Sequence, residues 1–157
     1  MDRRVFQQHI EGFPQKGSIK NITETAAFVY NLATRPLLDL VDQSAEPAPA
    51  DVDEYAFAGI ESAPSQLVRP RRLAASPGAF ECSWMQTISS GGSPGQPANA
   101  YLVPGQVVGV HVDDGVKDDG AVDIVNMQSL TRCGYKDYTT VEKVRSRDRL
   151  TWPVTTR

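Results

Sequence analysis

Cysteine and histidine are scarce in this sequence. The two cysteines, Cys82 and Cys133, cannot build a disulfide framework or a cysteine-based metal cluster. The two histidines, His9 and His111, lie far apart, so no local metal-binding motif is present. No CxxC motif is present, and we therefore expect both cysteines to be packing residues rather than redox centres. Reduced thiols favour a cytoplasmic protein.

Long apolar runs and strongly basic segments are also missing. No apolar stretch approaches the ~20 residues of a membrane span, and the N-terminal MDRRVFQQHIEGF lacks the apolar segment of a secretory signal. The formal net charge is -3, and the one basic run, residues 69–72, is short and fits a solvated loop. We therefore expect neither a membrane nor a nucleic acid as a partner.

What remains is sufficient for one folded domain, because the chain has 157 residues of which 40% are hydrophobic. The first part alternates short helices with one strand. We expect a helix that begins near Ser18 and buries Ile19, Ile22 and Ala26, a strand over residues 28–32, and a helix from Thr34 that buries Leu37, Leu38, Leu40 and Val41. One or two helical turns from Asp53 to Ala58 are expected to stop at Gly59.

The second half is rich in strand patterns. Phe80, Cys82, Trp84 and Ile88 alternate with polar residues that include Glu81, which predicts a half-buried strand with Glu81 on its polar face. Residues 101–112 form the longest strand-like run, with a bend or edge expected at Pro104-Gly105. A short helix is expected from Asp123 to Leu130, and a polar tail over residues 145–157. Strands outnumber helices, which favours an α+β or mainly-β barrel over a doubly wound sheet.

The start of the first expected helix has the features of an anion site. Lys16 provides a positive charge, Gly17 flexibility, and Ser18 a side chain typical of an N-cap. Free N–H groups at a helix N-terminus attract a phosphate. The alternative is an ordinary capped helix beside a solvated lysine, because serine caps are common.

Several segments follow one another in an order and spacing that together indicate a family. They are FQQHIEGFP (Phe6 to Pro14), KGSIKNITETAAFVYNLATRPL (Lys16 to Leu37), VDEYAFAGI (Val52 to Ile60), FEC (Phe80 to Cys82), GQVVGVHVDD (Gly105 to Asp114) and GYKDYTTV (Gly134 to Val141). With these segments the chain resembles the flavin reductase-like domain proteins, in particular their fungal members, which have the FMN-binding split β-barrel fold. The resemblance covers residues 6 to about 144.

The resemblance implies a mainly-β or α+β split barrel with short interposed helices that binds FMN at a homodimer interface. It also implies that NAD(P)H reduces the flavin. In the family, the segment that matches Lys16 to Ser18 usually reads Lys-Asp-Thr or Lys-Asp-Ser and lies against the flavin phosphate; here Gly17 replaces the acid. His9, in the matching FQQH segment, is a further candidate for the same phosphate, with a surface loop histidine as the alternative.

The family domain normally begins well before Phe6, with strands that close the barrel. We therefore expect residues 1–144 to be a partial split-barrel domain whose N-terminal strands are missing, followed by the tail at 145–157. Open barrel edges expose hydrogen-bonding groups and apolar faces. Such a chain is expected to be poorly soluble or to depend on a partner, either a second copy or a full-length paralogue.

Two functions follow from these observations. The first is an NAD(P)H-dependent flavin oxidoreductase, in which the cofactor carries the chemistry and the protein binds and orients it. The second is a non-catalytic or degenerate split-barrel fragment that binds FMN weakly or not at all. His111 is a candidate for the flavin or nicotinamide side, or else a hydrogen-bonded residue of the barrel wall. Trp84, Tyr101 and Tyr135 are core candidates before they are flavin-stacking candidates.

Overall fold

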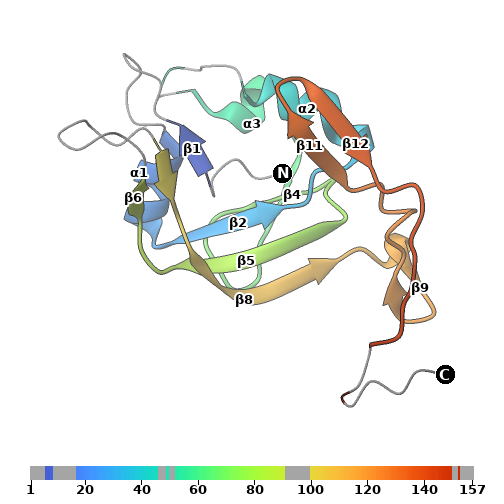
Figure 1. The fold of residues 1–157 in the computed structure, drawn as a ribbon. Coiled ribbons are helices and arrows are strands. Elements are labelled where there is room, and N and C mark those ends of the chain that lie inside the picture. Colours follow the sequence, from blue (N-terminus) through green and yellow to red (C-terminus); the bar gives the residue numbers. More distant parts are fainter. Residues whose placement is uncertain are drawn as a thin grey trace.

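An antiparallel sheet with the strand order β2-β5-β8 occupies the middle of the molecule (Figure 1). Its strands are β2 (Ala27–Asn31), β5 (Gly78–Trp84) and β8 (Gly105–Val112). The computed structural model describes residues 6–8, 17–45, 49, 52–90, 100–149 and 152. The strands expected over residues 28–32, around Phe80 and after Pro104-Gly105 are confirmed, although the second ends at Trp84 and does not include Ile88. Each carries apolar and β-branched residues, which suit a pleated surface.

The remaining strands form smaller sheets and hairpins around this one. One sheet has the order β1-β7-β6, and the others are the pairs β3-β4, β9-β10 and β11-β12. Their bounds are β1 (Phe6–Gln8), β3 (Ser62–Ala63), β4 (Arg72–Leu73), β6 (Ile88–Ser90), β7 (Ala100–Leu102), β9 (Lys117–Asp118), β10 (Ala121–Val122), β11 (Leu130–Gly134) and β12 (Asp137–Thr140). Short strands predominate, as expected for a mainly-β or α+β protein.

The helices are short. They are α1 (Gly17–Thr25), the 3-10 turn η1 (Arg35–Leu37), α2 (Leu38–Gln43), α3 (Glu54–Phe57) and the 3-10 turn η2 (Asp114–Val116). In Figure 1, α1 lies beside the start of β2, and α2 and α3 lie above the central sheet. Asp53 caps α3 by accepting a hydrogen bond from the Tyr55 N–H, and Gly59 follows with φ 61°, as expected for a residue that ends a helix. Among the described residues, no helix is long and apolar enough to cross a membrane.

The core lies where α1 packs against one face of the central sheet. Ile22 of α1, Phe28 of β2, Cys82 of β5 and Val103 form a buried cluster, with Trp84 packed against it. Ile19 and Ile22 are buried as expected, whereas Ala26 is exposed and has φ 52°, because it forms the turn between α1 and β2. The helix expected from Thr34 is present as η1 followed by α2, with Thr34 as the N-cap of η1. Its burial is less than expected: Leu37 is buried, but Leu38, Leu40 and Val41 are only half-buried.

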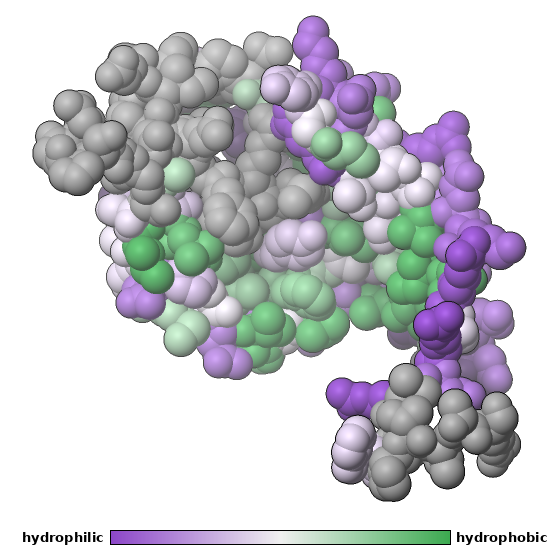
Figure 2. All heavy atoms as spheres, in the orientation of Figure 1, coloured by the Kyte–Doolittle hydropathy of each residue, from purple (hydrophilic) through white to green (hydrophobic). Residues whose placement is uncertain are grey.

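The pairing of β5 with β8 contains a bulge. Glu81 pairs with Gly109 and Cys82 with Val107, so Val108 has no partner in the register. The sheet face that carries Phe80 and its partner Val110 is apolar and partly open, because these residues are 43% and 63% exposed. The rings of Tyr30 and Phe80 stack there with centroids 5.8 Å apart. Figure 2 shows apolar side chains gathered over this lower part of the molecule, which includes β8.

The helix expected over Asp123 to Leu130 is absent, and that expectation was wrong. The segment is a turn in which the Asp123 carboxylate accepts hydrogen bonds from the N–H groups of Val125 and Asn126. An aspartate that binds nearby N–H groups in this way competes with helix formation. Leu130 begins β11 instead, and its N–H donates to the Ala33 carbonyl, which ties the β11-β12 hairpin to the end of β2.

Candidate functional site

The expected phosphate site falls at the first turn of α1. Gly17 is the first residue of this helix and is exposed, and Ser18 is half-buried. His9 and Lys16 lie outside the described residues, so their part in the site stays a prediction. The structure therefore places two of the four residues at one helix start.

This helix start has room and donors for an anion. Its first turn carries no acidic side chain, and a Cβ added at Gly17 would meet nothing within 4 Å. Among the described residues, no oxygen accepts a hydrogen bond from the N–H groups of Gly17, Ser18 or Ile19. These are the groups that a helix leaves unsatisfied at its N-terminus, and with the helix dipole they favour a negative charge. The residues present thus fit a phosphate.

A second candidate site is a pocket between the β3-β4 connection and the central sheet. The connection is held at its base by the pairing of Ser62 with Leu73 and Ala63 with Arg72. The Asn31 side chain accepts a hydrogen bond of 2.8 Å from the Leu73 N–H, and the Ser65 hydroxyl donates to the Pro70 carbonyl at 2.6 Å. The connection therefore has a defined shape above β5 and β8.

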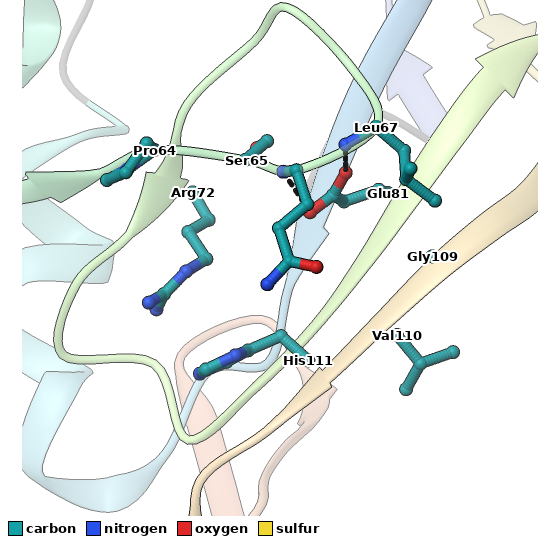
Figure 3. A pocket seen from close by; sticks show the side chains of 9 residues that line it. Pro64, Ser65, Leu67, Arg72, Glu81, Gly109, Val110 and His111 are labelled. Atoms are coloured by element: carbon teal, nitrogen blue, oxygen red, sulfur yellow. Dashed lines mark hydrogen bonds between the residues drawn. The ribbon is translucent and has the colours of Figure 1, made fainter.

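Glu81 of β5 fastens this connection to the sheet (Figure 3). Its carboxylate, in a residue only 4% exposed, accepts hydrogen bonds from the N–H groups of Gln66 at 2.9 Å, Leu67 at 2.6 Å and Val68 at 3.2 Å. Burial on its own would raise the pKa of Glu81, but these donors and the nearby Arg72 outweigh it and hold the pKa below its ordinary value. Glu81 is therefore an ionised, buried carboxylate.

The expectation that Glu81 lies on the polar face of a half-buried strand was wrong. Glu81 is buried, whereas Phe80, which the alternation placed inside, is 43% exposed. Both faces of β5 are used: one carries the core residue Cys82, and the other lies beneath residues 64–70. The prolines at 64 and 70, which favour extended chain with free N–H groups, were the signal in the sequence that this segment needs an acceptor.

The pocket beside Glu81 has a volume of about 280 Å³. Its lining includes Pro64, Gln66, Arg72, Gly109 and His111. Figure 3 shows the guanidinium of Arg72 and the imidazole of His111 on the same side of the Glu81 carboxylate. Arg72 was expected in a solvated basic loop; it is half-buried, whereas Arg69 and Arg71 are exposed as expected.

The other singled-out residues divide between core and surface. Cys82 is buried in the core as expected, but Cys133 is exposed, so its assignment as a packing residue was wrong. Trp84 packs against the core and Tyr101 is half-buried, whereas Tyr135 is 94% exposed and is no core residue. In the part of the chain that the structure describes, no group of three or more His, Cys, Asp or Glu side chains could hold a metal ion.

Comparison with known proteins identifies the family. The model of the flavin reductase like domain matches residues 10–129. A protein of Halalkalibacterium halodurans is 30% identical over 141 residues, which cover 90% of this chain and 66% of that protein, just under two thirds of its length.

Solved structures show the same fold. Nitrilotriacetate monooxygenase component B from Bacillus cereus has a TM-score of 0.81 at 20% identity, covering 90% of this chain and 69% of that one. An FMN-binding protein from Thermus thermophilus has a TM-score of 0.68 at 15% identity, covering 90% of this chain and 70% of that one. With a family match over most of its length and the fold of the split-barrel proteins, the chain belongs to the flavin reductase-like domain family.

Proposed function

We propose that this protein binds FMN with the phosphate at the first turn of α1, and that it transfers hydride from NAD(P)H to the flavin. The observation that carries the proposal is the first turn of α1. Its N–H groups have no acceptor among the described residues, and the same turn carries no acidic side chain. Membership of the flavin reductase-like family and the fold shared with an FMN-binding protein support the choice of anion.

Bound FMN would supply the redox chemistry, accepting a hydride equivalent that neither a side chain nor the backbone can accept. The part of this chain is to bind and orient. The N–H groups of Gly17 and Ser18 would donate to phosphate oxygens, and the Lys16 ammonium would add a charge-assisted contact. We propose further that the active form is cytoplasmic and contains a partner chain, either a second copy, as the family resemblance implies, or a paralogue.

Lys16→Gln is expected to weaken FMN binding about tenfold, the equivalent of ~1.4 kcal/mol, because a charge-assisted phosphate contact is lost. Titration of FMN followed by quenching of its fluorescence measures this. Riboflavin, which lacks the phosphate, should bind both proteins equally. Lys20→Gln is the matched control, since Lys20 lies on the same helix with its side chain 70% exposed. Equal FMN affinity of the Lys16→Gln variant and the parent protein would contradict the phosphate assignment.

The alternative, a non-catalytic split barrel, is separated by a second measurement. If FMN binds and NAD(P)H oxidation rises on adding FMN, the protein is a reductase. If FMN binds without such a rise, it is a carrier. If neither FMN nor riboflavin binds to folded protein, the proposal fails and a structural role remains.

A further inference from the structure

We propose that the pocket between residues 64–72 and strands β5 and β8 binds a small organic monocarboxylate through Arg72 and His111. This inference does not depend on FMN binding. The pocket, at about 280 Å³, lies near the lower end of the roughly 300–1,000 Å³ typical of small-molecule sites. It therefore suits a compact ligand.

Three polar side chains of this pocket have donors to spare. Among the described residues, no hydrogen bond or salt bridge engages the Arg72 guanidinium, the side-chain amide of Gln66 or the His111 imidazole. Arg72 and His111 are nonetheless half-buried and held in place on strands β4 and β8. A planar guanidinium donates two parallel hydrogen bonds to a carboxylate, so the donor set matches that group.

Charge decides between a monoanion and a dianion. The Glu81 carboxylate forms part of the same pocket, and its two oxygens are directed at the N–H groups of residues 66–68. The negative charge of Glu81 already offsets the positive charge of Arg72. Asp114 lies near His111 as well. Both carboxylates repel any anion in the pocket, and they repel a dianionic phosphate about twice as strongly as a monocarboxylate, which carries only one charge.

The rest of the lining provides contact for an apolar body. Pro64 and Leu67 border the pocket, and Leu67 is 65% exposed, so a ligand would remove apolar surface from water. Gly109 permits the connection to lie close to β8: a Cβ added there would come within 3.2 Å of Leu67 Cδ1 and 3.4 Å of Glu81 Cβ. The absence of a side chain at this position thus shapes the pocket floor.

The test uses the full chain with benzoate as the probe, benzamide as its neutral counterpart and inorganic phosphate as the dianion. Binding is measured from the changes in backbone amide chemical shifts in NMR spectra. We expect saturable shifts with benzoate near residues 66, 109 and 111. Benzamide should bind about tenfold more weakly, because one charged hydrogen-bonding pair is lost. Phosphate should also bind about tenfold more weakly, because its second charge is repelled by the nearby carboxylates. Equal binding of benzoate and benzamide, tighter binding of phosphate, or no saturation by about 20 mM benzoate, already a weak affinity, would overturn the proposal.

Two variants locate the site. Arg72→Gln should weaken benzoate binding about tenfold, and Arg72→Lys, which keeps the charge beside Glu81 but loses the planar pair of donors, should weaken it several-fold. Arg69→Gln is the control, because Arg69 is exposed and does not line the pocket. Unchanged affinity in both Arg72 variants would refute the site. Lys16→Gln should leave benzoate affinity intact, so failure of FMN binding and failure of this proposal are seen separately.

Discussion

Glu81→Ala is expected to lower the free energy of unfolding by roughly 3–5 kcal/mol, the range for breaking a buried hydrogen-bond network. The substitution removes the acceptor for the N–H groups of Gln66, Leu67 and Val68 without giving them another. For a chain of 157 residues this corresponds to a fall in Tm of about 10 °C. Urea unfolding followed by circular dichroism, together with a thermal melt, measures both quantities.

The charge of Glu81 is tested separately by pH. Because its folded-state pKa is lowered, its ionisation stabilises the fold above the unfolded pKa of about 4.3, and this stabilisation is lost as pH falls through the folded pKa. Glu81→Gln keeps the size but cannot titrate. The stability difference between parent and variant should be constant above about pH 5 and shrink below it.

Glu142→Ala provides the control for both measurements, since Glu142 is exposed and lies outside regular secondary structure. We expect it to change stability by less than about 0.5 kcal/mol. If Glu81→Ala were as mild as this control, the three hydrogen bonds would not hold the β3-β4 connection. If the difference between parent and Glu81→Gln did not depend on pH, the pKa of Glu81 would not be lowered in the folded state.

Gly105→Ala is expected to destabilise the fold by about 1–3 kcal/mol through overpacking. A Cβ at this position would lie 2.5 Å from Phe28 Cζ, 2.6 Å from Phe28 Cε1 and 3.1 Å from Cys82 Cβ. Phe28 is only 5% exposed and belongs to the buried cluster, so its ring has little space to move away. Chemical denaturation of the purified variant gives the change in free energy.

A double-mutant cycle with Phe28→Leu identifies the cause. Leucine lacks the ring atoms that clash, so the cost of Gly105→Ala should fall by about 1 kcal/mol or more in the Phe28→Leu background. Gly17→Ala is the matched glycine control: a Cβ there meets nothing within 4 Å, and the residue is helical. Strictly additive effects of Gly105→Ala and Phe28→Leu would show that the strain lies elsewhere.

Periodicity located the central strands well but assigned their faces poorly. The alternation around Phe80 and Cys82 correctly indicated a strand, yet it treated one face as solvent-exposed. A period of two reports only which residues share a face, and cannot show that a distant segment covers the polar one. Residues 64–70 do so, which is why the buried Glu81 was missed.

Local side-chain chemistry explains a second group of differences. The spacing of apolar residues after Asp123 resembles that of a helix, but the aspartate binds the N–H groups that a helix would need, and the segment turns. At the candidate phosphate site, a helix was correctly predicted to begin near Ser18, but α1 already begins at Gly17, so Ser18 lies within the first turn and is not the N-cap. The pocket of Arg72 and His111 depends on contacts across sequence-distant strands, and no local pattern could reveal it.

The bulge in β8 has a consequence for how molecules meet. Within the described part of the chain, β8 is the border of its sheet, so one row of its amides and carbonyls faces outward. The irregularity at Val107–Val108 interrupts the even spacing of that row. A foreign strand that pairs with β8 could form an unbroken ladder only along residues 105–107 or along residues 109–112. Both stretches are shorter than the roughly six or seven residues typical of a fibril-forming segment.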